Sequence, residues 1–234
     1  MTESPLRFLP RDLEPGRVVA CLGLVSDTHL PERLDALPHA VFDVLSGVDL
    51  VLHAGDVGDL RVLDELSVVA PVVAVHGNDD TAEAQRELPY QQVVVVAGTR
   101  LLLTHAHYPD RAEELASRAN DAWEPKLARR AAMGHSAGAN VVVFGHTHVP
   151  LAQVFENVVL INPGALAAPN NATRQTVQTV ALLFVHDDGT ASVTHIDLAQ
   201  PDEAFLPRLD LTRGFAAAHA RFTAPLIPQK QAAR

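Results

Sequence analysis

The chain has 234 residues, of which 47% are hydrophobic and 20% are charged, a balance typical of a globular protein with little disorder. Its formal net charge of -10 argues against a general nucleic-acid binder, because such proteins hold phosphate backbones with an excess of Lys and Arg. The single cysteine, Cys21, cannot form an internal disulfide, so nothing in the chain requires an oxidising compartment. No apolar stretch has the length of a signal peptide or a membrane span, which predicts a cytoplasmic protein without a membrane anchor.

The first third of the chain alternates between strand and helix patterns. The apolar spacing predicts strands at 17–25, 48–52 and 72–75, and helices at 31–45 and 60–66. Each predicted strand runs out into polar residues, which are Asp27 and His29, then Asp56, then Asn78. Because open α/β sheets bind ligands at the carboxyl ends of their strands, this repetition predicts a site there.

The second half has a different pattern, with short predicted strands joined by short turns. Residues 93–103 have the pattern of a hairpin that runs out into His105 and His107, and short strands are predicted at 141–145, 151–155, 158–161, 177–185 and 191–196. The strand at 141–145 ends in His146 and His148. This half is expected to be mostly antiparallel. The predicted fold class is therefore α/β, with two packed mixed β-sheets that share a core and are flanked by helices.

The chain is interpreted as one domain with a core at about 18–197, extensions at 1–17 and 199–234, and a helical hairpin insertion at 109–138. In the insertion, Asp110 and Glu113 form a capping-box pattern, Pro125 suits the first turn of a second helix, and Gly134 is expected to end it. One apolar face is predicted from Leu115, Ala119, Trp123 and Leu127. The basic residues of this segment are consistent with an ordinary solvated surface or with a lid that steers phosphate. The C-terminal extension, with a weak helical pattern at 215–222, is expected to pack loosely or against another subunit, so a homo-oligomer is an open alternative.

The polar residues at the strand ends form a set of candidate metal ligands. All of them supply oxygen or nitrogen donors, and they are Asp27, His29, Asp56, Asn78, His105, His146 and His148. Seven such groups exceed what one ion needs, whereas two divalent ions sharing a carboxylate would use them all. The set contains no thiolate, which argues against a closed structural zinc site.

In chain order, the motifs are Asp27-Thr28-His29, Gly55-Asp56, Gly77-Asn78, Thr104-His105 and Gly145-His146-Thr147-His148. Over about residues 18–197 the chain resembles the calcineurin-like metallophosphoesterases, and within them the small bacterial and archaeal phosphodiesterases. Asn162-Pro163-Gly164-Ala165 resembles a further turn of that subfamily. The resemblance implies a four-layer sandwich of two mixed sheets between helices.

By that resemblance, one metal ion binds Asp27, His29 and His148, a second binds Asn78, His105 and His146, and Asp56 bridges the two. The implied ions are divalent, with Mn first and Fe, Zn, Ni or Mg as alternatives. The implied reaction is hydrolysis of a phosphodiester or activated phosphate ester by a metal-bound hydroxide, on a small phosphate-ester substrate. Asn78 is expected to ligate one ion and to contact the phosphoryl group.

One position departs from the family pattern. Much of the superfamily has a histidine after the Asn ligand that assists the leaving group, whereas this chain has Asp79, and the subfamily often lacks that histidine. A carboxylate beside two cations is a poor general acid, so leaving-group assistance is in question and His107 is the alternative proton donor. His53 and His76 are interpreted as groups that support the metal ligands or only pack against their neighbours. His39, His186, His195 and His219 are interpreted as surface or core residues.

Two other functions compete with the phosphodiesterase hypothesis. The first is a non-catalytic protein-binding scaffold of the same fold, like the retromer subunit that has lost the catalytic histidine. This alternative rests on Asp79, which stands in place of that histidine. The second is a nuclease, which the acidic balance of the chain disfavours.

Overall fold

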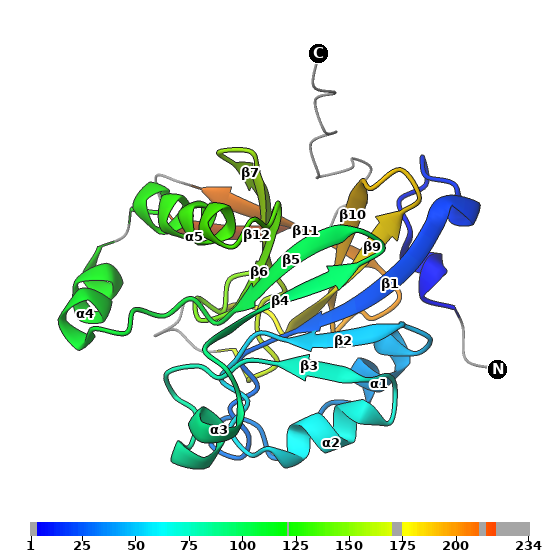
Figure 1. Cartoon of the computed structure of the whole chain (residues 1–234). Helices are drawn as coiled ribbons and strands as arrows, with labels where there is room; N and C mark the ends of the chain where they lie inside the picture. Colours follow the sequence, from blue (N-terminus) through cyan, green and yellow to red (C-terminus); the bar gives the residue numbers. More distant parts are fainter. Residues whose placement is uncertain (1–3, 121, 170–174, 211–213, 219–234) are drawn as a thin grey trace.

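The computed structural model describes residues 4–120, 122–169, 175–210 and 214–218. Within this part of the chain, the strands form two sheets that face each other, with helices on the outer sides (Figure 1). The predicted fold class is therefore confirmed. In the described residues, no helix is both long and apolar enough to cross a membrane.

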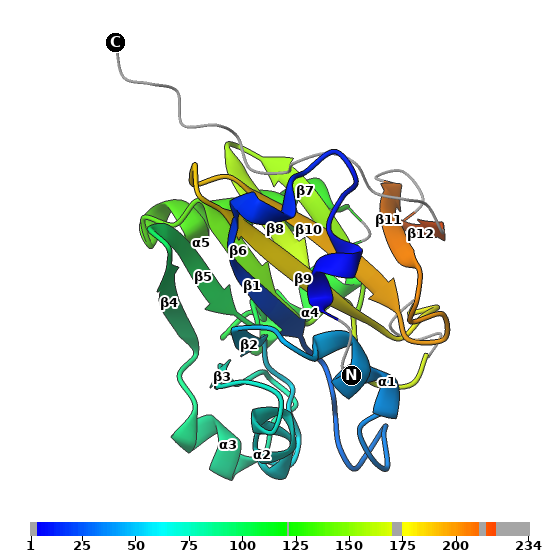
Figure 2. The same ribbon diagram turned by 90° about the vertical axis from the view of Figure 1, so that its right-hand side faces the viewer.

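The larger sheet has seven strands in the order β12-β11-β10-β9-β1-β2-β3. Strand β1 (Val18–Val25) pairs in parallel with β2 (Leu50–His53), and β2 pairs in parallel with β3 (Val72–Ala74). On its other side β1 pairs antiparallel with β9 (Thr179–His186), as Figure 2 shows, and β10 (Ala191–Asp197), β11 (Ala204–Asp210) and β12 (Gly214–Ala218) follow antiparallel. The predicted parallel strands exist, and they share their sheet with strands from the end of the chain.

The smaller sheet has five strands in the order β4-β5-β6-β8-β7. Its members are β4 (Gln91–Val96), β5 (Thr99–Thr104), β6 (Val141–Phe144), β7 (Leu151–Phe155) and β8 (Val158–Asn162). Strand β6 lies parallel to both β5 and β8, whereas the β4–β5 and β7–β8 pairs are antiparallel. Since β5 and β6 are parallel, the histidines that follow them leave the same edge of this sheet.

The main core lies between the two sheets. Leu22 and Leu24 of β1 are fully buried in it together with Leu101 and Leu103 of β5. The alternate residues of β1, Cys21 and Val25, pack on the opposite face of the sheet, under the helices. A strand buried on both faces needs apolar residues at every position, which is why residues 20–25 form a continuous apolar run broken only by Gly23.

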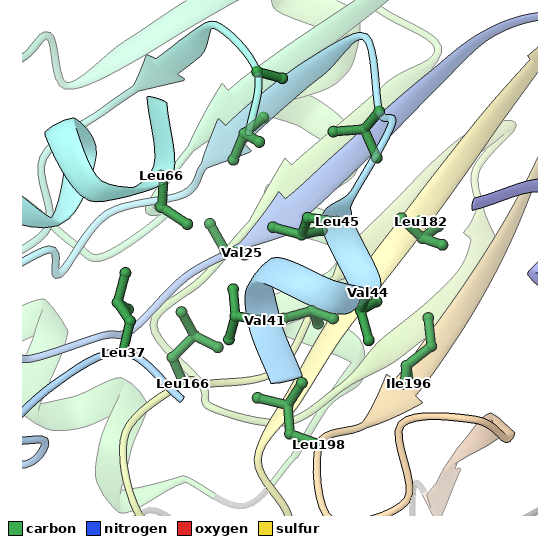
Figure 3. Close-up of a cluster of buried hydrophobic side chains, with 14 of the residues drawn as sticks. Val25, Leu37, Val41, Val44, Leu45, Leu66, Leu166, Leu182, Ile196 and Leu198 are labelled. Atoms are coloured by element: carbon green, nitrogen blue, oxygen red, sulfur yellow. The ribbon is translucent and has the colours of Figure 1, made fainter. Parts of the chain in front are cut away.

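Helices α1 (His39–Leu45) and α2 (Arg61–Ser67) cover the outer face of the larger sheet. Figure 3 shows Val41, Val44 and Leu45 of α1 packed with Val25 and Leu182 in this second cluster. The predicted helix at 31–45 is wrong in its first half, because α1 begins only after Pro38, which has extended backbone angles at the N-cap. A proline also disfavours helical angles at the residue before it.

Two further elements differ from the sequence prediction. Helix α3 (Ala82–Glu87) was not predicted, although Thr81 caps it by accepting a hydrogen bond from the Ala84 N–H. The helix predicted at 215–222 is wrong over 215–218, which belong to β12 and pair with β11, and residues 219–222 lie outside the described residues. Pairing with a neighbouring strand outweighs a weak helical pattern in this short segment.

Helices α4 (Arg111–Ala119) and α5 (Glu124–Ser136) occupy the predicted insertion. Asp110 caps α4 as predicted, since its side chain accepts from the Ala112 and Glu113 N–H groups. Figure 1 shows α5 against the smaller sheet and α4 standing farther out. Accordingly Trp123 and Leu127 are buried, whereas Leu115 is 56% exposed and Ala119 is exposed, so the predicted apolar face is wrong over α4.

The predicted end of α5 at Gly134 is also wrong, because the helix continues to Ser136. Gly134 is buried, and a Cβ at this position would lie 2.8 Å from Val142 Cγ2 and 3.1 Å from Val158 Cγ1. The glycine therefore allows close packing of α5 on β6 and β8.

Candidate metal centre

The candidate ligands lie in tight turns directly after the strands. Asp27, His29, Asp56, His146 and His148 all have positive φ angles, between 49° and 72°. Such angles are uncommon for residues other than glycine and cost conformational energy, so they persist where the surrounding structure enforces them. Their concentration among the predicted ligands marks this edge of the two sheets as a functional site.

One group of buried donors comes from both sheets. Asp27 and His29 follow β1, His148 follows β6, and one donor atom from each lies within 4.8 Å of the others. His148 Nε2 is 3.3 Å from Asp27 Oδ1 and 3.1 Å from His29 Nε2. A carboxylate and two imidazoles at this spacing suit a divalent transition-metal ion.

A second group overlaps the first. Asp27, Asp56 and His105 also place donor atoms within 4.8 Å of one another. Asp56 Oδ2 lies 3.1 Å from His105 Nε2 and 3.6 Å from His29 Nε2. The Asp56 carboxylate of the second group therefore also lies next to His29 of the first, where a bridging ligand would have to be.

Glycines make room for these carboxylates. A Cβ at Gly77 would lie 2.0 Å from Asp56 Oδ1, and a Cβ at Gly145 would lie 2.9 Å from Asp27 Oδ2. Neither glycine can be replaced without displacing a candidate ligand, because the contact falls on buried carboxylate oxygens.

Hydrogen bonds behind the histidines fix which ring nitrogen faces the site. His105 Nδ1 donates to the Ala54 carbonyl at 2.8 Å, and His148 Nδ1 lies 2.9 Å from Gln175 Oε1. Gln175 uses its amide nitrogen to donate to the Ala167 and Val177 carbonyls, so its oxygen accepts from His148. Both histidines thus keep Nε2 as the lone-pair donor toward the ligand groups, the usual arrangement of metal-binding histidines.

His146 lies outside these two groups of aspartates and histidines, and Asn78 follows β3 with Asp79 next to it. The His146 ring is 5.1 Å from the His105 ring, centroid to centroid, and its Nε2 donates to Glu114 Oε1 of α4 at 2.8 Å. Glu114 also accepts from the Tyr108 N–H and from Arg118 Nε. Asn78 Nδ2 donates to Asp79 Oδ1. Gln175 and Glu114 were not foreseen from the sequence, because neither follows a strand or belongs to a motif.

Two buried polar atoms of the site have no hydrogen-bond partner in the described residues. They are His105 Nε2 and Asn78 Oδ1, both from the predicted second-metal set. Burial lowers the pKa of His105, but without a cation the adjacent Asp56 carboxylate outweighs it and raises that pKa to about 9, so a cation would bind in exchange for the Nε2 proton. In spite of burial, the same contact holds the pKa of Asp56 below its usual range. A site that is rich in carboxylates and imidazoles, and that contains buried ligand atoms without a hydrogen bond, fits divalent cations.

The two residues proposed for leaving-group chemistry differ in their surroundings. Asp79 is 44% exposed, its Oδ2 is 3.9 Å from Arg33 Nη2, and it lies close enough to His29 and Asp56 to form a third candidate ligand group. His107 is buried beside His105, and its Nδ1 has no partner among the described residues. Burial and the neighbouring histidines lower the pKa of His107 to about 4, so it is neutral at pH 7.

The other described histidines belong to none of the ligand groups, although His53 lies close to Asp27, Asp56 and His105. His53 is fully buried and bonds Thr28 Oγ1 at 2.8 Å, while His195 is buried and bonds the Asn162 carbonyl. His186 bonds Ser192, His39 contacts Asp43, and His76 bonds the Gly77 carbonyl. These contacts agree with the packing and surface roles predicted for them. His219 lies outside the described residues.

The Asn-Pro-Gly turn supports the loop that carries His146 and His148. Asn162 Nδ2 donates to the Gly145 carbonyl and to Thr147 Oγ1, and Asn162 Oδ1 accepts from the Gly164 N–H. Through these hydrogen bonds, the turn supports the loop that carries His146 and His148.

Two mixed sheets with clustered histidines and aspartates at their strand ends define a metallophosphoesterase fold. The chain belongs to the calcineurin-like phosphoesterase superfamily, whose domain model matches residues 21–188. It is 34% identical to a probable metallophosphoesterase of Methanocaldococcus jannaschii over 75% of this chain and 81% of that relative. It is 25% identical to a phosphodiesterase of the same organism, over 61% of this chain and 82% of the relative.

Among solved structures, vacuolar protein sorting 29 from Cryptosporidium parvum has the same fold, with a TM-score of 0.62. The match covers 88% of this chain and 98% of that one at 18% identity, which shows the fold alone.

Proposed function

We propose that the protein hydrolyses small phosphate esters, phosphodiesters in particular, with two divalent cations. The observation that carries the proposal is the pair of overlapping ligand groups: both contain Asp27, and Asp56 of the second group lies 3.6 Å from His29 of the first. In this proposal Asp27, His29, His148 and Asp56 hold one cation, while Asp56, Asn78, His105 and His146 hold the other. When bound, such cations polarise phosphoryl oxygens and lower the pKa of water.

The identity of the cations is part of the proposal. Carboxylate, amide and imidazole donors suit Mn²⁺, Fe²⁺, Zn²⁺ and Ni²⁺, and Mg²⁺ to a lesser degree, without selecting one. We place Mn²⁺ first on the resemblance of the motifs to those of the small phosphodiesterases.

The protein's own groups give little help to the leaving group. Asp79 lies near Arg33 and close to the buried Asp56 carboxylate. His107 is neutral at pH 7, because burial and the neighbouring histidines lower its pKa to about 4. General acid catalysis contributes about 10² to 10⁴ in rate. Esters with acidic leaving groups, such as aryl esters, need it least, so the proposed activity favours them.

The test is metal binding together with turnover of an aryl phosphodiester. Metal-depleted protein is titrated calorimetrically with Mn²⁺, and the loaded protein is assayed with bis(4-nitrophenyl) phosphate. We expect two bound ions. We also expect Asp56→Asn to weaken both, with at least a roughly hundredfold loss of kcat/KM, because each ion depends on the shared carboxylate.

The matched control is Asp64→Asn, which changes an exposed carboxylate on α2 and should behave as the wild type. Turnover by protein that binds no divalent ion would contradict the proposal. Two bound ions without turnover of any phosphate ester would instead favour the protein-binding alternative, for which the likeness to vacuolar protein sorting 29 offers only a shared fold.

A further inference from the structure

Arg130 of α5 is a buried guanidinium with few partners. It is 2% exposed, its Nη1 donates to the Lys126 carbonyl at 2.8 Å, and its guanidinium carbon lies 4.5 Å from the centre of the Phe144 ring. Its Nε has no acceptor, and no carboxylate of the described residues lies within 4.0 Å of it. Burial lowers the pKa of Arg130 to about 10, so the group is still charged at pH 7. A buried charge without a counterion is unfavourable, which points to an anion that binds from outside.

Arg130 lines a pocket of about 260 Å³ that opens on the candidate metal centre. Asp56, His146 and His148 line the same pocket, and Arg118 and Lys126 line it with Arg130. We call Arg118, Lys126 and Arg130 the basic wall. All three come from α4 and α5, in a chain whose net charge is -10.

Among the described residues, the carboxylates near Arg130 are already engaged. Glu114 accepts from Arg118, from His146 and from the Tyr108 N–H, while Asp56 contacts His105, and Asp79 faces Arg33. The proposed function assigns the reacting phosphoryl group to the cations held by the ligand residues that line this pocket. One phosphoryl group there leaves the buried charge of Arg130 without a counterion among the described residues.

We propose that Arg130, in the basic wall, binds a second anionic group of the substrate, so that the preferred substrate is a compact phosphate ester whose organic part carries a carboxylate or a second phosphate. This inference rests on the proposed phosphoesterase function. A volume of about 260 Å³ holds a small ester of this kind, since pockets for drug-sized ligands begin at about 300 Å³. An arginine pairs with either oxyanion through two parallel N–H donors.

The test uses two diesters with the same leaving group. One is 4-nitrophenyl 2-carboxyethyl phosphate, and the other is its 2-carbamoylethyl amide, which has nearly the same shape without the charge. We expect the Mn²⁺-loaded wild type to prefer the acid by about tenfold or more in kcat/KM, the usual effect of a charge-assisted hydrogen bond. Arg130→Met should lower kcat/KM for the acid by about tenfold more than for the amide.

Arg111→Met is the matched control, because Arg111 is exposed on α4 and does not line the pocket. If Arg130→Met does not fold, as judged by circular dichroism, Arg130→Gln, which keeps hydrogen-bonding groups but loses the charge, decides the question through the same ratio. Equal rates of the wild type on acid and amide would overturn the second-anion site and leave the proposed function intact. Equal losses on both esters in the arginine variant would also overturn it. Failure of the proposed function is a different result, namely no turnover of either ester by metal-loaded wild type.

Discussion

Three histidines of the site are each oriented by an acceptor behind the ring. The acceptors are the Ala54 carbonyl for His105, Gln175 Oε1 for His148 and Glu114 Oε1 for His146. The first two belong to the body of the protein, whereas Glu114 comes from α4. With its Nε2 proton held by Glu114, His146 keeps Nδ1 as its lone-pair donor, and α4 thereby becomes a support of the candidate metal centre.

The Glu114 contact predicts a specific change in metal binding. Glu114→Ala should weaken one of the two Mn²⁺ sites about 10- to 100-fold, because His146 loses the group that orients it. Glu114→Gln should recover most of the affinity, since an amide oxygen still accepts from His146 Nε2. Calorimetric titration of metal-depleted protein measures both effects, with Glu113→Ala as the exposed control on the same turn. Wild-type affinity at both sites in Glu114→Ala would show that the contact has no such role.

The strand-end residues of the site could be predicted from the sequence, whereas its supporting residues could not. Asp27, Asp56 and His105 follow apolar runs, and their position alone indicates that they meet at one edge. Glu114 lies in an amphipathic helix where Leu115 was expected to be buried, and the structure reverses these two neighbours. The contacts of Glu114 with His146 and Arg118 decide which face of α4 turns inward, and hydrophobic periodicity carries no information about such contacts.

At the scale of elements, α4 and α5 have different roles in the insertion. Leu127 and Ala131 of α5 belong to a core cluster with Val142 and Leu160 of the smaller sheet. Helix α4 has no such cluster, and its buried residue is the charged Glu114. Removal of both helices would therefore expose the hydrophobic cluster that α5 covers.

The close packing of α5 predicts the cost of a single methyl group. Gly134→Ala places a Cβ 2.8 Å from Val142 Cγ2 and 3.2 Å from the Ala139 carbonyl oxygen, so the helix must shift. We expect the free energy of unfolding to fall by about 1–3 kcal/mol, the usual effect of overpacking. Chemical denaturation measures it. Gly16→Ala is the matched control, because no atom lies within 4 Å of that Cβ. A stability equal to that of the wild type would mean that α5 packs less tightly than described.

At the scale of the whole molecule, the sequence predicted two sheets but not their membership. Strand β1 pairs with β9, so that Leu22 lies opposite Leu183, far along the chain. Local periodicity identifies each strand as buried, but it does not say which distant strand lies beside it. The expectations of a cytoplasmic location and of a homo-oligomer stay predictions.

The charge and the pocket together predict that nucleic acids are poor substrates. A net charge of -10 repels a polyanion as it approaches the protein, and a pocket of about 260 Å³ admits one ester group but not a long strand. The comparison uses thymidine 5′-(4-nitrophenyl phosphate) and a long oligothymidylate carrying the same terminal ester, so that the leaving group is identical. We expect kcat/KM for the oligomer to be lower by on the order of a hundredfold at low salt, since electrostatic effects on association span about 10 to 10³.

Added salt screens the repulsion and should recover part of the loss, whereas the part due to pocket size should persist. Comparable rates on the two substrates at low salt would contradict the small-substrate assignment and would favour the nuclease alternative.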